Sequence, residues 1–177
     1  MRLEPRVLNE PSSDGARLLF RRLLEATQEQ LAALEKRADP EALHDFRVAL
    51  RRLRSVARSF RESLSGPVRG KQRRALRAMA DLTNDTRDAE VQLAWLAAER
   101  TRLPRKDLPA VNWLTARLEA RRRAGYELVE KLARRFRRLA GELERSLARR
   151  SGRDGGPEGP PLGIALAELL RVQLGHL

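Results

Sequence analysis

Apolar residues recur at the spacing of an α-helix through most of this chain, and the pattern is clearest between Leu43 and Phe60. At about 100° per residue, the apolar positions of this stretch fall mainly on one face of a helix. The same period continues in further segments, which are divided by proline, glycine and short polar residues. The pattern therefore predicts an all-α fold: an antiparallel bundle of about four long helices, followed by a short C-terminal helix.

Breaks in the pattern set the expected helix boundaries. Asp39 followed by Pro40 predicts a helix start, because a carboxylate can cap the first turn and proline suits the first helical position. Ser13 or Asp14 is expected to cap the preceding helix. We expect helices over 15–37, 40–65, 68–100 with a break at 83–86, 110–150, and 163–174. The chain then divides into a flexible arm (1–13), a helical bundle (14–150), and a linker with the short last helix (151–177).

A stripe of basic residues lies beside the apolar face of the helix expected after Asp39. No acidic residue occurs between Val48 and Arg61, although a solvated helix would ordinarily place acids four positions from its arginines. At about 1.5 Å per residue, the row is about 21 Å long. Such a row is typical of a polyanion site, and its members are His44, Arg47, Arg51, Arg54 and Arg58.

The excess positive charge is concentrated in two segments. The formal net charge is +13, with eleven Lys and Arg against two acids in 44–77, and sixteen against six in 100–150. Arginine outnumbers lysine by 33 to 4, which suits bidentate recognition of phosphate, although codon bias is an alternative reason for the ratio. The distribution favours a localised site for an anionic partner.

Several classes of protein are excluded or disfavoured by composition. The chain has no cysteine, so it forms neither a disulfide nor a thiolate metal site. No apolar run approaches the ~18–20 residues of a membrane span, and the N-terminal residues lack the apolar core of a signal peptide. We expect a cytoplasmic protein that does not bind membranes.

Two motifs resemble one known family. His44, Arg47, Val48, Arg51 and Arg52, continued by Leu53 and Arg54, form an H-x-x-R-V-x-x-R-R-L-R pattern, and residues 81–91 read DLTNDTRDAEV. In this order the two elements resemble the signature helix and the L-G-x-x-R-D-x-D-V element of the CHAD (conserved histidine α-helical) domains. The resemblance implies an all-helical domain that binds inorganic polyphosphate in a basic groove or pore, and an association with polyphosphate granules.

Further basic residues are expected to face this row from other helices. Arg77 matches a position where the family carries Lys or Arg, and Arg87 is either a local ion pair with Asp88 or a phosphate-facing residue held by an acid. Arg121, Arg122 and Gly125 interrupt an apolar stripe between Leu118 and Leu128. A buried charge needs a partner, so we expect this portion to line a wet cavity or groove into which Arg117 and Arg121 point. The candidate polyphosphate-binding residues are His44, Arg47, Arg51, Arg52, Arg54, Arg58, Lys71, Arg74, Arg77, Arg87, Arg117 and Arg121.

Two other functions remain open alternatives. Nucleic-acid binding fits the net charge, because phosphate contacts dominate affinity, but aromatic residues are only 4% and no helix-turn-helix or zinc spacing is apparent. Phosphoanhydride hydrolysis would need metal-holding carboxylates or a positioned base. The acids Asp81, Asp85, Asp88 and Glu90 form the one cluster, which is more typical of an ion-paired face. We expect a non-catalytic protein with no metal and no cofactor.

The resemblance has one departure. Members of the family usually contain two related helical halves, whereas this sequence has one histidine–arginine helix. A truncated chain, a natural half-length protein and a divergent form are all consistent with this. A single half leaves one wall of the groove missing and apolar surface exposed, so we expect a homodimer whose basic stripes face a shared channel.

Overall fold

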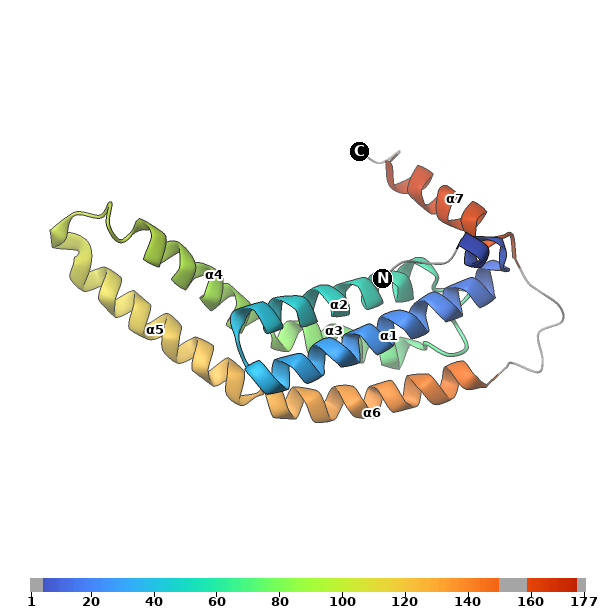
Figure 1. The fold of residues 1–177 in the computed structure, drawn as a ribbon, viewed down its shortest axis with the longest axis horizontal. Helices are drawn as coiled ribbons and strands as arrows, with labels where there is room; N and C mark the ends of the chain where they lie inside the picture. Colours follow the sequence, from blue (N-terminus) through green and yellow to red (C-terminus); the bar gives the residue numbers. More distant parts are fainter. Residues whose placement is uncertain (1–4, 150–158, 175–177) are drawn as a thin grey trace.

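The computed structural model describes residues 5–149 and 159–174, and this part of the chain is helical with no β-strand (Figure 1). The all-α prediction is confirmed. The elements are η1 (Pro5–Asn9), α1 (Ser12–Arg37), α2 (Pro40–Ser59), α3 (Gly70–Leu82), α4 (Asn84–Glu99), η2 (Arg105–Asp107), α5 (Leu108–Glu127), α6 (Val129–Ala148) and α7 (Leu162–Leu174).

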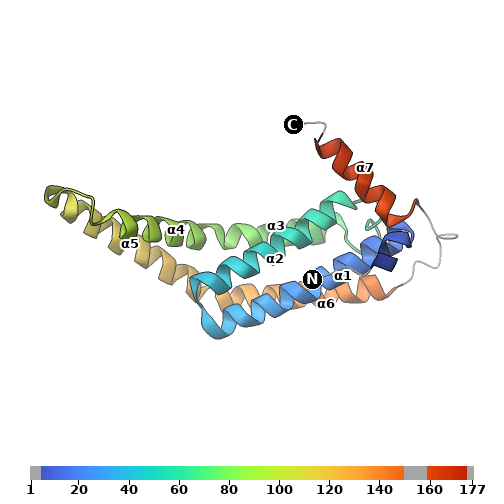
Figure 2. The same ribbon diagram turned by 45° about the horizontal axis from the view of Figure 1, so that its top comes forward.

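Four helices, α1, α2, α3 and α6, pack side by side as a bundle, while α4 and α5 project from one end of it as a hairpin (Figures 1 and 2). The short helix α7 lies at the opposite end, near the start of α1. The longest dimension of the molecule therefore runs from the tip of the hairpin to α7. This arrangement separates the surface of the bundle from the surface of the hairpin.

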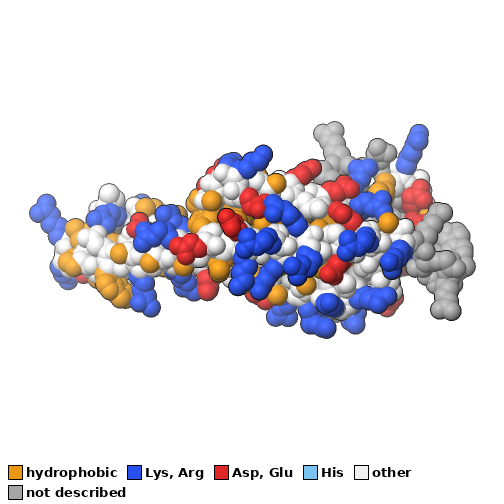
Figure 3. All heavy atoms as spheres, turned by 90° about the horizontal axis from the view of Figure 1, so that it is seen from below, with side chains coloured by type: hydrophobic (Ala, Val, Ile, Leu, Met, Phe, Trp, Pro, Cys, Tyr) orange, Lys and Arg blue, Asp and Glu red, His pale blue; other side chains and the backbone are white. Residues whose placement is uncertain are grey.

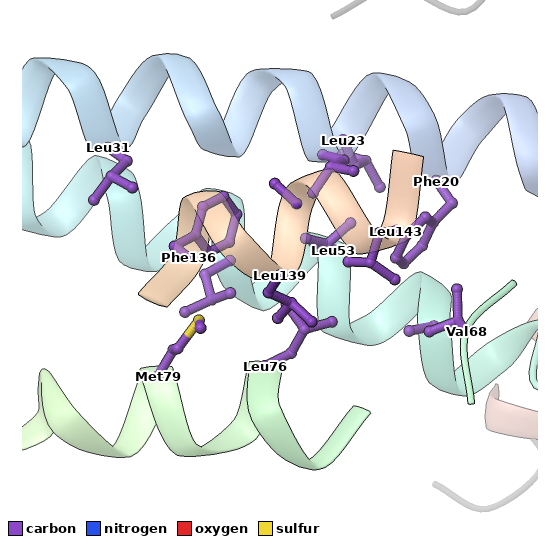
Figure 4. Close-up of a cluster of buried hydrophobic side chains, with 14 of the residues drawn as sticks. Phe20, Leu23, Leu31, Leu53, Val68, Leu76, Met79, Phe136, Leu139 and Leu143 are labelled. Carbon is purple, nitrogen blue, oxygen red and sulfur yellow. The ribbon is translucent and has the colours of Figure 1, made fainter. Parts of the chain in front are cut away.

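The bundle core consists of leucine and phenylalanine side chains contributed by all four helices (Figure 4). Phe20, Phe46 and Phe136 are fully buried, and the rings of Phe46 and Phe136 meet edge to face with centroids 6.1 Å apart. Leu76 and Met79 bring α3 into the same core. Each fully buried side chain of this size contributes about 1.5–3 kcal/mol, so α2 and α3 are held firmly beside each other.

The start of α2 follows directly from its sequence. Asp39 is the N-cap, and its Oδ1 accepts a hydrogen bond of 2.7 Å from the backbone N–H of Ala42, while Pro40 occupies the first helical position. The helix ends at Ser59, and turns continue from Phe60 to Pro67. The predicted start is confirmed, whereas the regular helix ends earlier than the sequence predicted.

The N-terminal segment differs from the prediction of a loose arm. Residues 5–9 form the 3-10 helix η1, and Val7 is buried in the bundle core. Helix α1 then begins at Ser12 with Pro11 as its N-cap, and neither Ser13 nor Asp14 caps it. The burial of Val7 in the core holds this segment against the bundle, although its composition is mostly polar. Of the linker predicted over 151–161, residues 151–158 lie outside the described residues.

The prediction of one long helix over 110–150 is wrong. The chain changes direction at Leu128, which separates α5 from α6, and the Leu128 N–H bonds to the Gly125 carbonyl. Just before this break, α4 and α5 approach so closely that a Cβ on Gly125 would lie 1.8 Å from Thr86 Oγ1. The predicted break between α3 and α4 is confirmed at Thr83.

The hairpin has a small core of its own. Ala89 and Leu96 of α4 pack against Val111 and Leu118 of α5. This cluster is separate from the bundle core, and it covers only the inner faces of the two helices. No helix in the described part of the chain is long and apolar enough to cross a membrane.

Candidate functional site: a basic groove between α2 and α3

A groove of about 370 Å³ lies between α2 and α3. The apolar core fixes α2 and α3 beside each other. The polar side chains along the facing edges of the two helices then form the walls of the groove. Its other lining residues are small or apolar, namely Ser55, Ala57 and Leu76, and no acid lines it. Its arginines are Arg51, Arg54, Arg58, Arg61, Arg73 and Arg77.

Most of these arginines have no carboxylate partner. In the described part of the chain, the one ion pair at the groove joins Arg77 to Asp81, at 3.9 Å and with both side chains exposed. Arg73 donates instead to the backbone carbonyl of Val68. Guanidinium groups held close together without counter-charges repel one another, so the groove is suited to an anion with several negative charges.

Basic residues are not confined to this groove. On the face shown in Figure 3, Lys and Arg side chains spread over the bundle, with Asp and Glu among them. Several arginines of the bundle bond to acids, as Arg137 does to Glu35 and Arg134 to Glu130. What distinguishes the groove is the lack of such partners together with a concave shape.

Two residues of the predicted stripe lie beyond the groove, toward the hairpin. His44 is exposed near the start of α2. Arg47 is half-buried, and it donates hydrogen bonds of 2.6 Å to Thr83 Oγ1 and 3.0 Å to Asn84 Oδ1. Burial lowers the pKa of Arg47 from its ordinary value, partly opposed by the nearby charge of Asp88. Arg47 thus ties α2 to the junction of α3 and α4.

Arg87 belongs to a partly buried network at the base of the hairpin. Its Nη1 lies 3.1 Å from Glu90 Oε2, and the other oxygen of Glu90 accepts a hydrogen bond from the Tyr126 hydroxyl. Burial, together with this bond, raises the pKa of Tyr126 above its ordinary value. The acid that pairs with Arg87 is therefore Glu90 and not Asp88. The interpretation of Arg87 and Asp88 as a local ion pair is wrong, since the partner of Arg87 lies three residues away on the same helix.

Arg117 and Arg121 do not face the basic stripe. Arg121 pairs with Asp85 at 2.7 Å and lines an open cleft between α4 and α5, whereas Arg117 lies over the ring of Trp113, 5.7 Å from its centroid. The charged side chains that interrupt the apolar stripe avoid burial in the bundle core, because α5 projects from the bundle as part of the hairpin. Within the described residues, Arg117 and Arg121 therefore do not share a cavity with the groove between α2 and α3, contrary to the prediction from the sequence.

The other predicted residues also fall outside the groove. Arg52 faces the opposite side of α2, in an open depression against α1 that contains Glu25, Glu29 and Asp45. Lys71 and Arg74 are exposed on α3 and do not line the groove. The structure thus brings together Arg51, Arg54, Arg58 and Arg77 of the predicted set.

Two groove residues, Arg61 and Arg73, were missed by the sequence analysis. Arg61 follows α2 in the turn, three positions after Arg58, and Arg73 precedes Arg77 by four positions on α3. The helical spacing that selected the other arginines would have identified both.

The acidic cluster has the character of an ion-paired face. Asp81, Asp85 and Glu90 each pair with an arginine, namely Arg77, Arg121 and Arg87. Within residues 5–149 and 159–174, no group of three or more acids or histidines is placed to hold a metal ion.

Comparison with protein-family models gives a match over most of the chain. The family model described as CHAD domain matches residues 18–177, which is nearly the whole chain. A search of curated proteins finds no matching relative.

Proposed function

Because the chain belongs to the CHAD domain family, we propose that it binds inorganic polyphosphate in the basic groove between α2 and α3. The observation that carries this proposal is the set of arginines that line one groove without acids among them. Polyphosphate repeats a negative charge along a flexible chain, so successive phosphates can meet successive guanidinium groups. Each such contact is charge-assisted and can be bidentate.

The groove has the shape that an extended anion requires. From Arg51 to Arg58 the lining spans seven positions, which is about 10 Å along α2 at ~1.5 Å per residue, and Arg61 follows in the turn. Arg73 and Arg77 of α3 form the opposite wall. A compact single phosphate would reach one or two of these side chains, whereas a chain of phosphates can contact both walls.

We propose binding without catalysis. Hydrolysis of a phosphoanhydride needs a metal held by carboxylates or a positioned general base. The groove is lined by arginine, serine, alanine and leucine, and none of these side chains supplies that chemistry at neutral pH. The protein would therefore hold polyphosphate for another component.

The test compares two double variants that remove the same charge from opposite sides of α2. Arg54→Gln/Arg58→Gln removes two positive charges from the groove, whereas Arg22→Gln/Arg52→Gln removes two from the depression between α1 and α2. Each lost contact to a charged group costs about 1.5 kcal/mol, which is about tenfold in affinity. Calorimetric titration with long-chain polyphosphate should show about a hundredfold weaker binding for the groove variant.

The control variant should bind polyphosphate within a few-fold of the unmodified protein. Equal losses in both variants would indicate that net charge, and not the groove, governs binding.

Nucleic acid is distinguished by competition at equal phosphate concentration. The groove lining contains no aromatic side chain on which a base could stack, so polyphosphate should displace both duplex and single-stranded nucleic acid. If nucleic acid displaces polyphosphate instead, the proposed ligand is wrong.

A further inference from the structure

The outer face of α4 is apolar and uncovered. Its inner face packs on α5 through Leu96, while Val91 and Trp95 on the opposite face are 52% and 62% exposed. Ala94 and Ala98 are exposed beside them, and no charged residue occurs from Val91 to Ala98. A helix that is apolar on both faces is ordinarily covered on both, so this surface is suited to a partner.

The charges at the two ends of this face are opposite in sign. Asp88 is exposed seven residues before Trp95, and it makes no ion pair within the described residues. Arg102 lies in the turn just beyond the end of α4, where it is 76% exposed and bonded to Glu99 of its own chain. Two copies of α4 that cross in opposite directions at Trp95 would therefore place each Asp88 near the partner's Arg102.

The location of this face permits two strongly basic chains to approach. Each chain carries a net charge of +13, and contact between two basic grooves would be repulsive. The outer face of α4 lies on the projecting hairpin, away from the groove and near the tip of the molecule (Figure 1). Pairing there buries the uncharged surface and keeps the arginine-rich bundles apart.

We propose that a second copy of this chain docks on the outer face of α4, by antiparallel packing of the two α4 helices about Trp95. Each copy then supplies the same surface to the other, as an isologous two-fold contact requires. The pairing needs no phosphate, so it is independent of the proposed ligand. It leaves both grooves open, one on each copy.

The first test is the mass in solution, measured by sedimentation without polyphosphate. The unmodified protein should sediment as a dimer, and Trp95→Glu should halve the mass. Trp113→Glu is the matched control, because Trp113 is 64% exposed on α5 and not on α4, and this variant should remain a dimer. A monomeric unmodified protein, or equal loss of the dimer in both variants, would overturn the proposal.

A charge exchange tests the antiparallel arrangement itself. Asp88→Arg and Arg102→Asp should each weaken the dimer at least tenfold, because each places like charges together at both ends of the contact. The double variant restores opposite charges and should recover most of the affinity. Circular dichroism of each variant verifies that the helices are intact. Additive loss in the double variant would contradict antiparallel pairing about Trp95.

Discussion

Glu90 is a buried carboxylate of α4 that bonds to a residue of its own helix and to one of α5. Its side chain is 2% exposed, and its two oxygens bond to Arg87 and to Tyr126, the latter two residues before the break at Leu128. A carboxylate in this position is stabilised only while both partners are present, because burial without them costs several kcal/mol. Glu90 thus joins α4 to the end of α5 at the base of the hairpin.

We expect Glu90→Gln to lower the free energy of unfolding by about 2 kcal/mol, since the pair with Arg87 is lost. Tyr126→Phe should cost about 1 kcal/mol. Because Tyr126→Phe removes the donor of the hydrogen bond to Glu90 and Glu90→Gln removes the charge of its acceptor, the double variant should lose less than the sum. Urea denaturation measures all three. Glu130→Gln, which breaks an exposed pair with Arg134, should stay within about 0.5 kcal/mol, and a comparable loss there would contradict a specific role for Glu90.

His44 is the one histidine among the residues that the structure describes. It is exposed on the stripe that leads into the groove, where a bound polyanion would favour the protonated imidazole. Because the bound state then holds the proton more tightly than the free state, polyphosphate affinity should rise as pH falls from about 8 to about 6. His44→Ala should flatten this dependence in titrations over the same range. An unchanged profile in the variant would remove His44 from the site.

Much of the site at residue level could be predicted from the periodicity of α2. Helical spacing alone placed Arg51, Arg54 and Arg58 on one stripe, and the structure brings them to one groove. It could not place Arg117, because a residue's position on its own helix does not say which neighbour that helix meets. Arg52 was included because it belongs to the motif, although its direction around the helix axis differs from that of the stripe by about 100°.

At the scale of elements, the contact between Thr86 and Gly125 sets how closely α4 and α5 approach. We expect Gly125→Ala to destabilise the protein by about 1–3 kcal/mol, because the added methyl group overlaps Thr86 and separates the helices. Gly141→Ala on α6 is the control. Its Cβ would meet only the flexible Arg145 side chain at 3.4 Å, so it should stabilise by about 0.5–1 kcal/mol through helix propensity.

Thermal denaturation of the two glycine variants should therefore shift in opposite directions. A Gly125→Ala protein as stable as the unmodified one would show that the two helices are not held at this distance.

Helix boundaries could be predicted where neighbouring residues in the sequence set them. They could not be predicted where contacts between distant segments set them. Asp39-Pro40 and the polar run after Leu82 mark real boundaries. The break at Leu128 has no capping residue and no proline, and the helical pattern continues through it. Its cause is the packing of Gly125 and Tyr126 against α4, a contact between segments far apart in the sequence.

At the scale of the whole molecule, the chain separates two kinds of surface. The bundle carries the basic groove, whereas the hairpin carries the uncharged outer face of α4. The first is proposed to bind polyphosphate and the second to bind another copy. A change on one surface should leave the other function intact, because different elements form them.

The central claim is that a bound polyphosphate chain supplies the negative charge that balances the arginines of the groove. A crystal structure of the protein with a short linear polyphosphate tests it most directly. The account predicts phosphate groups within hydrogen-bond distance of Arg51, Arg54 and Arg58, with Arg73 or Arg77 contacting them from α3. Phosphate bound elsewhere while this groove stays empty, or carboxylates that close on these arginines, would contradict it.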